Sequence, residues 1–283
     1  MTAAAKLAGF ALALGVVFVA ATLAGAAVDP APRDDAEPAA AHGGDMAEDH
    51  EAPAQPVRGL AVSEHGLRLD LQTTELEPGA PSELRFRILD AAGAPVRAFD
   101  VEHERRMHLI VVRRDMRGFQ HLHPRMSADG TWSVPIRLPD AGTYRVLADF
   151  SHDETASTLG ADLRVSGDAQ LRELPAPATS TETTGGLRVA LDAPPLRAGR
   201  EADLRFTVTQ DGRTVTPEPY LGARGHLVVL REGDLAFLHV HPMDDGGATF
   251  AATFPSPGRY RLFLQVKVDG DVRTAAYTVE VPR

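Results

Sequence analysis

The chain repeats itself, and this duplication limits the possible folds more than any other feature of the sequence. Blocks of the first half recur in the second: 66–71 as 186–191, 107–124 as 225–242, and 138–144 as 254–260. The offset between the copies falls from 120 to 118 to 116 residues along the chain, as expected where connecting loops differ in length. The sequence therefore predicts two diverged copies of one domain.

Each copy has the pattern of a β-sandwich. Short runs rich in Val, Leu, Phe and Thr alternate with polar residues and end at Gly, Pro or Asp. LPDAGTY and FPSPGRY, which end at Tyr144 and Tyr260, resemble a tyrosine corner, in which the Tyr hydroxyl bonds back to the preceding loop. We expect an all-β protein of two tandem immunoglobulin-like β-sandwiches. In the first copy we expect strands near 66–72, 83–89, 107–113, 119–123, 131–137, 143–150 and 160–165.

The N-terminal residues predict export. Leu7 to Val28 carry no charge, follow Lys6 and are numerous enough to span a bilayer. Ala24-Gly25-Ala26 is also an acceptable signal-peptide cleavage site. We therefore expect an extracytoplasmic protein, anchored to the cytoplasmic membrane by this segment, or secreted if the segment is cleaved.

The composition divides the chain into five parts. They are 1–28, a signal peptide or membrane anchor; 29–57, a disordered acidic linker; 58–168, the first sandwich; 169–183, a linker; and 184–283, the second sandwich. The acidic linker carries His42, Met46 and His50 at intervals of four residues. Imidazole, thioether and carboxylate groups in one such stretch suit a weak metal site, and the alternative is a plain solvated spacer.

The histidines of the repeated block carry the functional prediction. In a hairpin centred on 114–118, His108 faces His121 or His123, and these two point to the same side. The second copy repeats the spacing with His226, His239 and His241. Eight of the 18 aligned positions are identical, and all three His are among the eight. We expect a three-His metal cluster in each sandwich.

Several observations favour copper as the ion. The chain has no Cys, which excludes disulfides, thiolate zinc sites, blue-copper centres and iron–sulfur clusters. Met107, Met126 and Met243 stand close to the His clusters and are weaker candidate ligands. Imidazole and thioether together suit Cu(I) or Cu(II), while zinc and nickel remain possible.

The sequence resembles bacterial exported, membrane-anchored tandem β-sandwich proteins described as heavy-metal-binding or copper-handling. The resemblance rests on the membrane segment, the His/Met tether, the two HL-[IV]-V…F-x-H-x-HP blocks and the Gly-x-Tyr corners, and covers about 58–283. It implies an extracytoplasmic, non-enzymatic role in the sequestration or handling of a metal.

Other functions remain open to different degrees. A formal charge of −10 argues against a nucleic-acid partner. No HExxH or GxSxG motif is present, so we expect no enzyme. The alternative to metal binding is a cell-surface interaction or scaffold module, with structural histidines and an unidentified protein partner.

Overall fold

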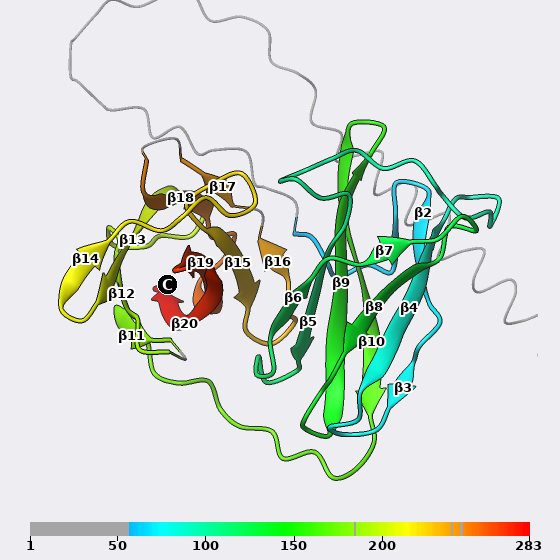
Figure 1. The fold of residues 1–283 in the computed structure, drawn as a ribbon, viewed down its shortest axis with the longest axis horizontal. Helices are drawn as coiled ribbons and strands as arrows, with labels where there is room; N and C mark the ends of the chain where they lie inside the picture. The colour runs from blue at the N-terminus through cyan, green and yellow to red at the C-terminus, as the bar shows by residue number, and fades with distance from the viewer. Residues whose placement is uncertain (1–56, 184, 239, 244–245) are drawn as a thin grey trace, which may run out of the picture. The chain divides into compact units, whose positions relative to one another are not determined.

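The structure is a computed structural model that describes residues 57–183, 185–238, 240–243 and 246–283. These residues form strands joined by turns and extended segments (Figure 1). Within these ranges we find no helix with the length and hydropathy needed to cross a membrane. The predicted anchor or signal segment, 1–28, and the acidic linker up to residue 56 lie outside the described residues.

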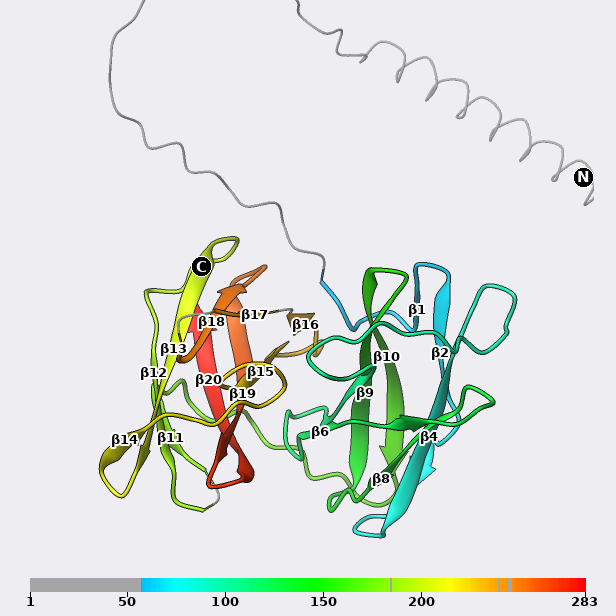
Figure 2. The ribbon, with the colours of Figure 1, turned by 45° about the horizontal axis from the view of Figure 1, so that its top comes forward.

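The first repeat is a sandwich of two five-stranded sheets. One sheet has the order β1-β2-β4-β8-β7, with the bounds Ser63–Glu64, Leu67–Leu71, Ser82–Leu89, Trp132–Ile136 and Arg125–Met126. The other has the order β3-β10-β9-β5-β6, with the bounds Glu75–Leu76, Thr155–Val165, Gly142–His152, His108–Arg113 and Gln120–Leu122. All seven predicted strands are present, and the long β9–β10 hairpin is prominent in Figure 2.

The second repeat follows the same plan. Its first sheet has the order β11-β12-β13-β18-β17, with the bounds Ser180–Glu182, Arg188–Asp192, Glu201–Gln210, Ala248–Thr253 and His241–Pro242. Strand β14, Arg213–Val215, also pairs with β13. Its second sheet has the order β16-β15-β19-β20, with the bounds Phe237–Leu238, His226–Arg231, Gly258–Val268 and Asp271–Val281. Strand β11 falls in the segment 169–183 that we predict as linker, so the strands of this sandwich begin before residue 184.

Each sandwich has its own core, formed by the inward side chains of its two sheets. Phe86, Trp132 and Tyr144 belong to the first core, while Phe206, Phe250 and Tyr277 belong to the second. In each repeat, the alternation of apolar and polar residues in the first sheet follows the pleat, as in β13, whose apolar residues are buried and whose other residues are largely exposed. The prediction of an all-β fold made of two immunoglobulin-like sandwiches is confirmed.

Both tyrosine corners are present. The hydroxyl of Tyr144 donates a hydrogen bond to the carbonyl oxygen of Asp140 over 2.9 Å. The hydroxyl of Tyr260 donates in the same way to the carbonyl oxygen of Ser256 over 2.8 Å. Both tyrosines are fully buried, so each bond fixes a loop to the start of a long strand.

Strands β5 and β15 are buried on both faces. Leu109 and Val111 point into the core of the first sandwich. Ile110 alternates with them and belongs to a third apolar cluster, which also contains Val228 and Phe263 of the second repeat. This cluster, which we call the inter-repeat cluster, joins the outer faces of the β5–β6–β9 and β15–β16–β19 sheets. It places one end of each repeated His block against the other repeat.

Candidate metal centre

Three histidines of the first repeat converge at the end of the β5–β6 hairpin. Leu109 lies opposite Leu122 and Ile110 opposite His121, so the next pair along the hairpin is His108 and His123. One ligand nitrogen from each of His108, His121 and His123 lies within 4.8 Å of the others. The rings of His121 and His123 are 4.7 Å apart, as the two-residue period of a strand requires. The predicted convergence within the first repeat is confirmed; we call these three residues the triad.

The triad lies on the face of the sheet that meets the second repeat. His108 shares the outward side of β5 with Ile110, which belongs to the inter-repeat cluster. His108 is 3% exposed, and its partners in the triad are half-buried. The side chains therefore lie in surroundings that strengthen electrostatic interactions and favour neutral imidazoles.

Two hydrogen bonds indicate which ring nitrogens of His108 and His121 carry hydrogen. Nε2 of His108 lies 3.1 Å from the carbonyl oxygen of Glu102, which can only accept, so this nitrogen donates. Nδ1 of His121 lies 2.7 Å from Oε1 of Gln265, to which it donates. Nε2 of the Gln265 amide lies 3.5 Å from the hydroxyl oxygen of Thr274, to which it donates. A ring that ligates a metal commonly donates its other N–H to such an acceptor.

The nitrogens left over face one another. Nδ1 of His108 and Nε2 of His121 are 3.0 Å apart. A neutral imidazole carries one N–H, so both of these nitrogens present lone pairs. Nε2 of His123 is buried and has no hydrogen-bond partner. Facing lone pairs repel unless a cation lies between them, so this arrangement has the donor set of a metal centre.

Burial keeps the triad neutral. Removal from water, together with the neighbouring His108 and His123, lowers the pKa of His121 to about 3, against the hydrogen bond to Gln265, which raises it. The pKa of His123 falls to about 4, again chiefly through burial, with His108 and Arg105 adding to the shift. Burial also lowers the pKa of His108. Neutral imidazole is the form that binds a metal ion.

Two further histidines stand against the triad. The ring of His226, from the second repeat, lies 4.6 Å from that of His121 at an interplanar angle of 22°. It also lies 5.4 Å from the ring of His108, at 7°. His103 meets His226 edge-on at 5.9 Å. Burial holds the pKa of His226 well below its usual value. Spacing alone assigned His226 to a cluster of the second sandwich, whereas the structure places it beside the triad of the first.

The other predicted ligands do not lie in the triad. His239 lies outside the described residues, so the second three-His cluster stays a prediction, and His241 is exposed on β17. Met107 is buried in the core of the first sandwich, and Met126 packs against that core. Met243 is exposed. The tether residues His42, Met46 and His50 lie outside the described residues.

A cavity of about 110 Å³ borders His108. Arg58, Glu102, Arg105 and Asp149 are among the residues that line it. Burial raises the pKa of Asp149 to about 6, although its carboxylate accepts a hydrogen bond of 2.6 Å from Thr158. The cavity places these charged side chains beside His108, the member of the triad that lines it.

Sequence reasoning missed two participants in this site, Gln265 and His103. Gln265 stands opposite His226 on paired strands, as Asp149 stands opposite His108 in the first repeat. A polar side chain at this register position in both copies was a usable signal. His103 has a φ of 46°, which is uncommon outside glycine, and it lies in a tight turn that the strand pattern does not reveal.

The fold and the site define a tandem immunoglobulin-like β-sandwich protein with a histidine cluster where its repeats meet. The chain belongs to the family described as a domain of unknown function, DUF8832, which matches it twice, over residues 61–167 and 181–283. The two matches correspond to the two sandwiches. No curated protein matches the chain.

Several solved structures resemble the chain at low identity. They include the Escherichia coli adhesin FdeC (14% identity, TM-score 0.26), a Salmonella alpha-2-macroglobulin mutant (14%, 0.28) and domains 4–9 of the surface layer protein SbsC (10%, 0.25). The matches cover 79%, 80% and 76% of this chain. They span 66%, 16% and 31% of those chains, in the same order. Similarity at this level carries no argument about function.

Proposed function

We propose that this chain is an extracytoplasmic copper-binding protein that sequesters or hands on the ion without enzymatic chemistry. His108, His121 and His123 hold the ion, and Glu102 and Gln265 orient two of the rings. The N-terminal segment anchors the protein to the membrane, or directs its secretion if cleaved. The exported heavy-metal-binding proteins that the sequence resembles support this assignment.

The observation that carries the proposal is the distance of 3.0 Å between Nδ1 of His108 and Nε2 of His121, the nitrogens that the two hydrogen bonds to Glu102 and Gln265 leave without hydrogen. With the side-chain oxygen of Gln265 toward His121, the other nitrogen of each ring is engaged with an acceptor, and neither ring can turn its N–H toward its neighbour and keep that bond. The buried, unpartnered Nε2 of His123 supplies a third donor. Most buried polar atoms of proteins have a hydrogen-bond partner, so an unpartnered imidazole nitrogen beside two others supports a ligand role.

The donor set favours copper among the divalent ions. The triad contains neutral nitrogens and no carboxylate, which disfavours the hard ions calcium and magnesium. Nitrogen sites bind Cu(II) more tightly than Ni(II) or Zn(II) in the usual order of stability. Zn(II) and Cu(II) would each need a water or another side chain beside the three imidazoles, so the order of stability is what distinguishes them.

The test is metal binding by the full chain, purified without a histidine tag. Copper, nickel and zinc are offered in equal amounts, and the retained metal is measured by mass spectrometry. We expect the wild type to retain copper. Loss of a residue that only orients a ligand costs roughly 10–100-fold in metal affinity, so we expect the copper affinity of His121→Asn/His123→Asn to fall at least as far. His65→Asn is the matched control, because His65 is exposed and its φ of 53° suits Asn. Equal retention by the double variant and the wild type would contradict the proposal.

A specific observation also supports a second candidate, an interaction module with structural histidines. If the Gln265 amide turned over, its NH2 group would donate to Nδ1 of His121, and Nε2 of His121 would donate to His108. The His108–His121–Gln265 chain would then be satisfied without metal. On this hypothesis the double variant loses stability, and the wild type retains no metal.

A further inference from the structure

Five imidazoles lie together at this site, two more than the triad contains. His108, His121 and His123 direct nitrogens at one another, and His103 and His226 remain. The remaining pair comes from two different repeats. Their ring centroids are 5.9 Å apart, with the rings at 74° to each other.

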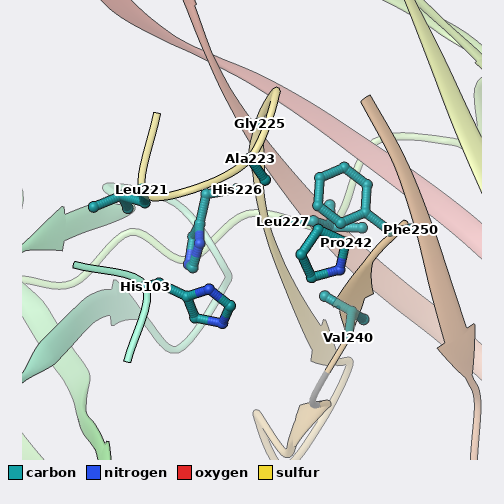
Figure 3. A pocket seen from close by; sticks show the side chains of 9 residues that line it. All are labelled: His103, Leu221, Ala223, Gly225, His226, Leu227, Val240, Pro242 and Phe250. Carbon is teal, nitrogen blue, oxygen red and sulfur yellow. The ribbon is translucent and has the colours of Figure 1, made fainter. Parts of the chain in front are cut away.

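The orientation of His226 separates it from the triad. Its ring lies nearly parallel to that of His121 at 4.6 Å, so the two rings pack by their faces. The lone pair of an imidazole nitrogen lies in the plane of its ring. His226 therefore presents its π face to His121 and directs its nitrogens elsewhere. Figure 3 shows its ring extending toward that of His103.

A small cavity lies where these two rings meet (Figure 3). It has a volume of about 20 Å³, enough for one water-sized guest. Apart from the two imidazoles, its lining is chiefly apolar: Leu221, Ala223, Leu227, Val240, Pro242 and Phe250. An ion held there could take one nitrogen from each imidazole, and no other side chain among the described residues of the lining offers a ligand atom.

We propose that His103 and His226 form a second metal position, specific for Cu(I), which only the paired repeats can build. The proposal extends the copper binding proposed above and rests on it. Cu(I) carries a single charge and accepts two ligands, so burial in an apolar cavity costs it less than it costs a divalent ion. Zn(II) demands four ligands, and this lining does not offer them.

The spacing of the two rings suits this ligation. In a linear nitrogen–metal–nitrogen arrangement each metal–nitrogen bond is about 2 Å long. Adding the distance from each nitrogen to the centre of its ring places the two ring centroids about 6 Å apart. The separation in the structure is 5.9 Å. The angle of 74° between the rings does not oppose this ligation, because each ring can turn about its metal–nitrogen bond.

The experiment counts Cu(I) ions bound by the full chain without oxygen, against a chromophoric Cu(I) chelator as competitor. We expect two ions in the wild type and in His65→Asn. We expect one ion in His103→Asn, in His226→Gln, and in His121→Asn/His123→Asn. Asn suits position 103 because of the φ of 46° there. Unchanged unfolding of His103→Asn, followed by the fluorescence of Trp132, shows that the first sandwich is intact.

X-ray absorption on His121→Asn/His123→Asn gives an independent readout, since its remaining Cu(I) should show two nitrogen ligands. Two ions retained by His103→Asn would overturn the proposal. One ion in the wild type, kept by His103→Asn and lost from the double variant, would overturn it while leaving the triad as the copper site. No copper bound by the wild type would overturn both proposals.

Discussion

His121 of the first repeat donates its Nδ1 hydrogen to the side-chain oxygen of Gln265 in the second, over 2.7 Å. The two residues are 144 positions apart in the chain. The bond determines which nitrogen of His121 is left for a ligand, so the second repeat controls the chemistry of the first.

Substitution of Gln265 separates metal binding from a structural role. Gln265→Glu keeps an acceptor for His121, so we expect copper affinity to be kept or raised. Gln265→Leu removes the acceptor, and we expect about 10–100-fold weaker binding. Competition titration with copper measures both.

The stability of the metal-free protein provides the contrast. If the amide of Gln265 instead donates to His121, Gln265→Glu puts two acceptors face to face. That variant would then be destabilised relative to the wild type, and copper affinity would not follow the order given above.

The buried histidines predict that the metal-free protein loses stability in acid. Burial lowers the pKa of His121 to about 3 and that of His123 to about 4, so the unfolded chain binds protons first as pH falls below about 6.5. The free energy of unfolding is therefore unaffected by these histidines above pH 6.5. It falls between pH 6.5 and pH 4, by at most about 1.4 kcal/mol per histidine per pH unit. Asp149, with a pKa raised to about 6, opposes this trend over part of the range.

Urea unfolding at pH 7, 6 and 5, with chelator present, measures this dependence. His108 and His226 act in the same direction, since burial lowers the pKa of each. His121→Asn/His123→Asn should show a shallower fall in stability with pH. An identical slope in the double variant would contradict the assignment.

The two repeats should be energetically coupled through Phe119 and Phe263. Their rings stack across the inter-repeat cluster with centroids 4.0 Å apart and an interplanar angle of 7°. We expect Phe119→Ala to cost about 2–3 kcal/mol, less than a fully buried Phe because the ring is half-buried. A double-mutant cycle with Phe263→Ala should give a coupling energy of about 0.5–1.5 kcal/mol. Additive effects within about 0.5 kcal/mol would show that the contact does not couple the repeats.

The tyrosine corners should contribute to the stability of the sandwiches that contain them. Tyr144→Phe removes the hydrogen bond to Asp140 and leaves a buried ring, so we expect a loss of about 1–2 kcal/mol. Trp132 is the one tryptophan of the chain and lies in the first core, so its fluorescence reports the unfolding of that sandwich. Tyr260→Phe is the matched variant and should act chiefly on the circular dichroism transition of the second sandwich. No change of either transition would contradict this role.

Much of the fold follows from local patterns in the chain. The run from His108 to Arg113 recurs at His226 to Arg231, and each run becomes a strand because its turns and apolar residues are local signals. The convergence of His108 with His121 and His123 also follows, since hairpin register and the alternation of side chains depend on neighbours in sequence. The unbroken apolar runs of both strands further indicate burial on two faces.

Sequence by itself thus determined two sandwiches, their tyrosine corners and a histidine triad on the first. Only the tertiary structure decided what the triad meets, because the outer apolar faces of two sheets can pack in many registers. The packing that forms brings Gln265 to His121 and His226 to the triad, across more than a hundred residues. The two-residue period of a strand sets the face of the sheet on which a side chain lies. The surface that this face meets depends on how apolar residues far apart in the chain are buried together.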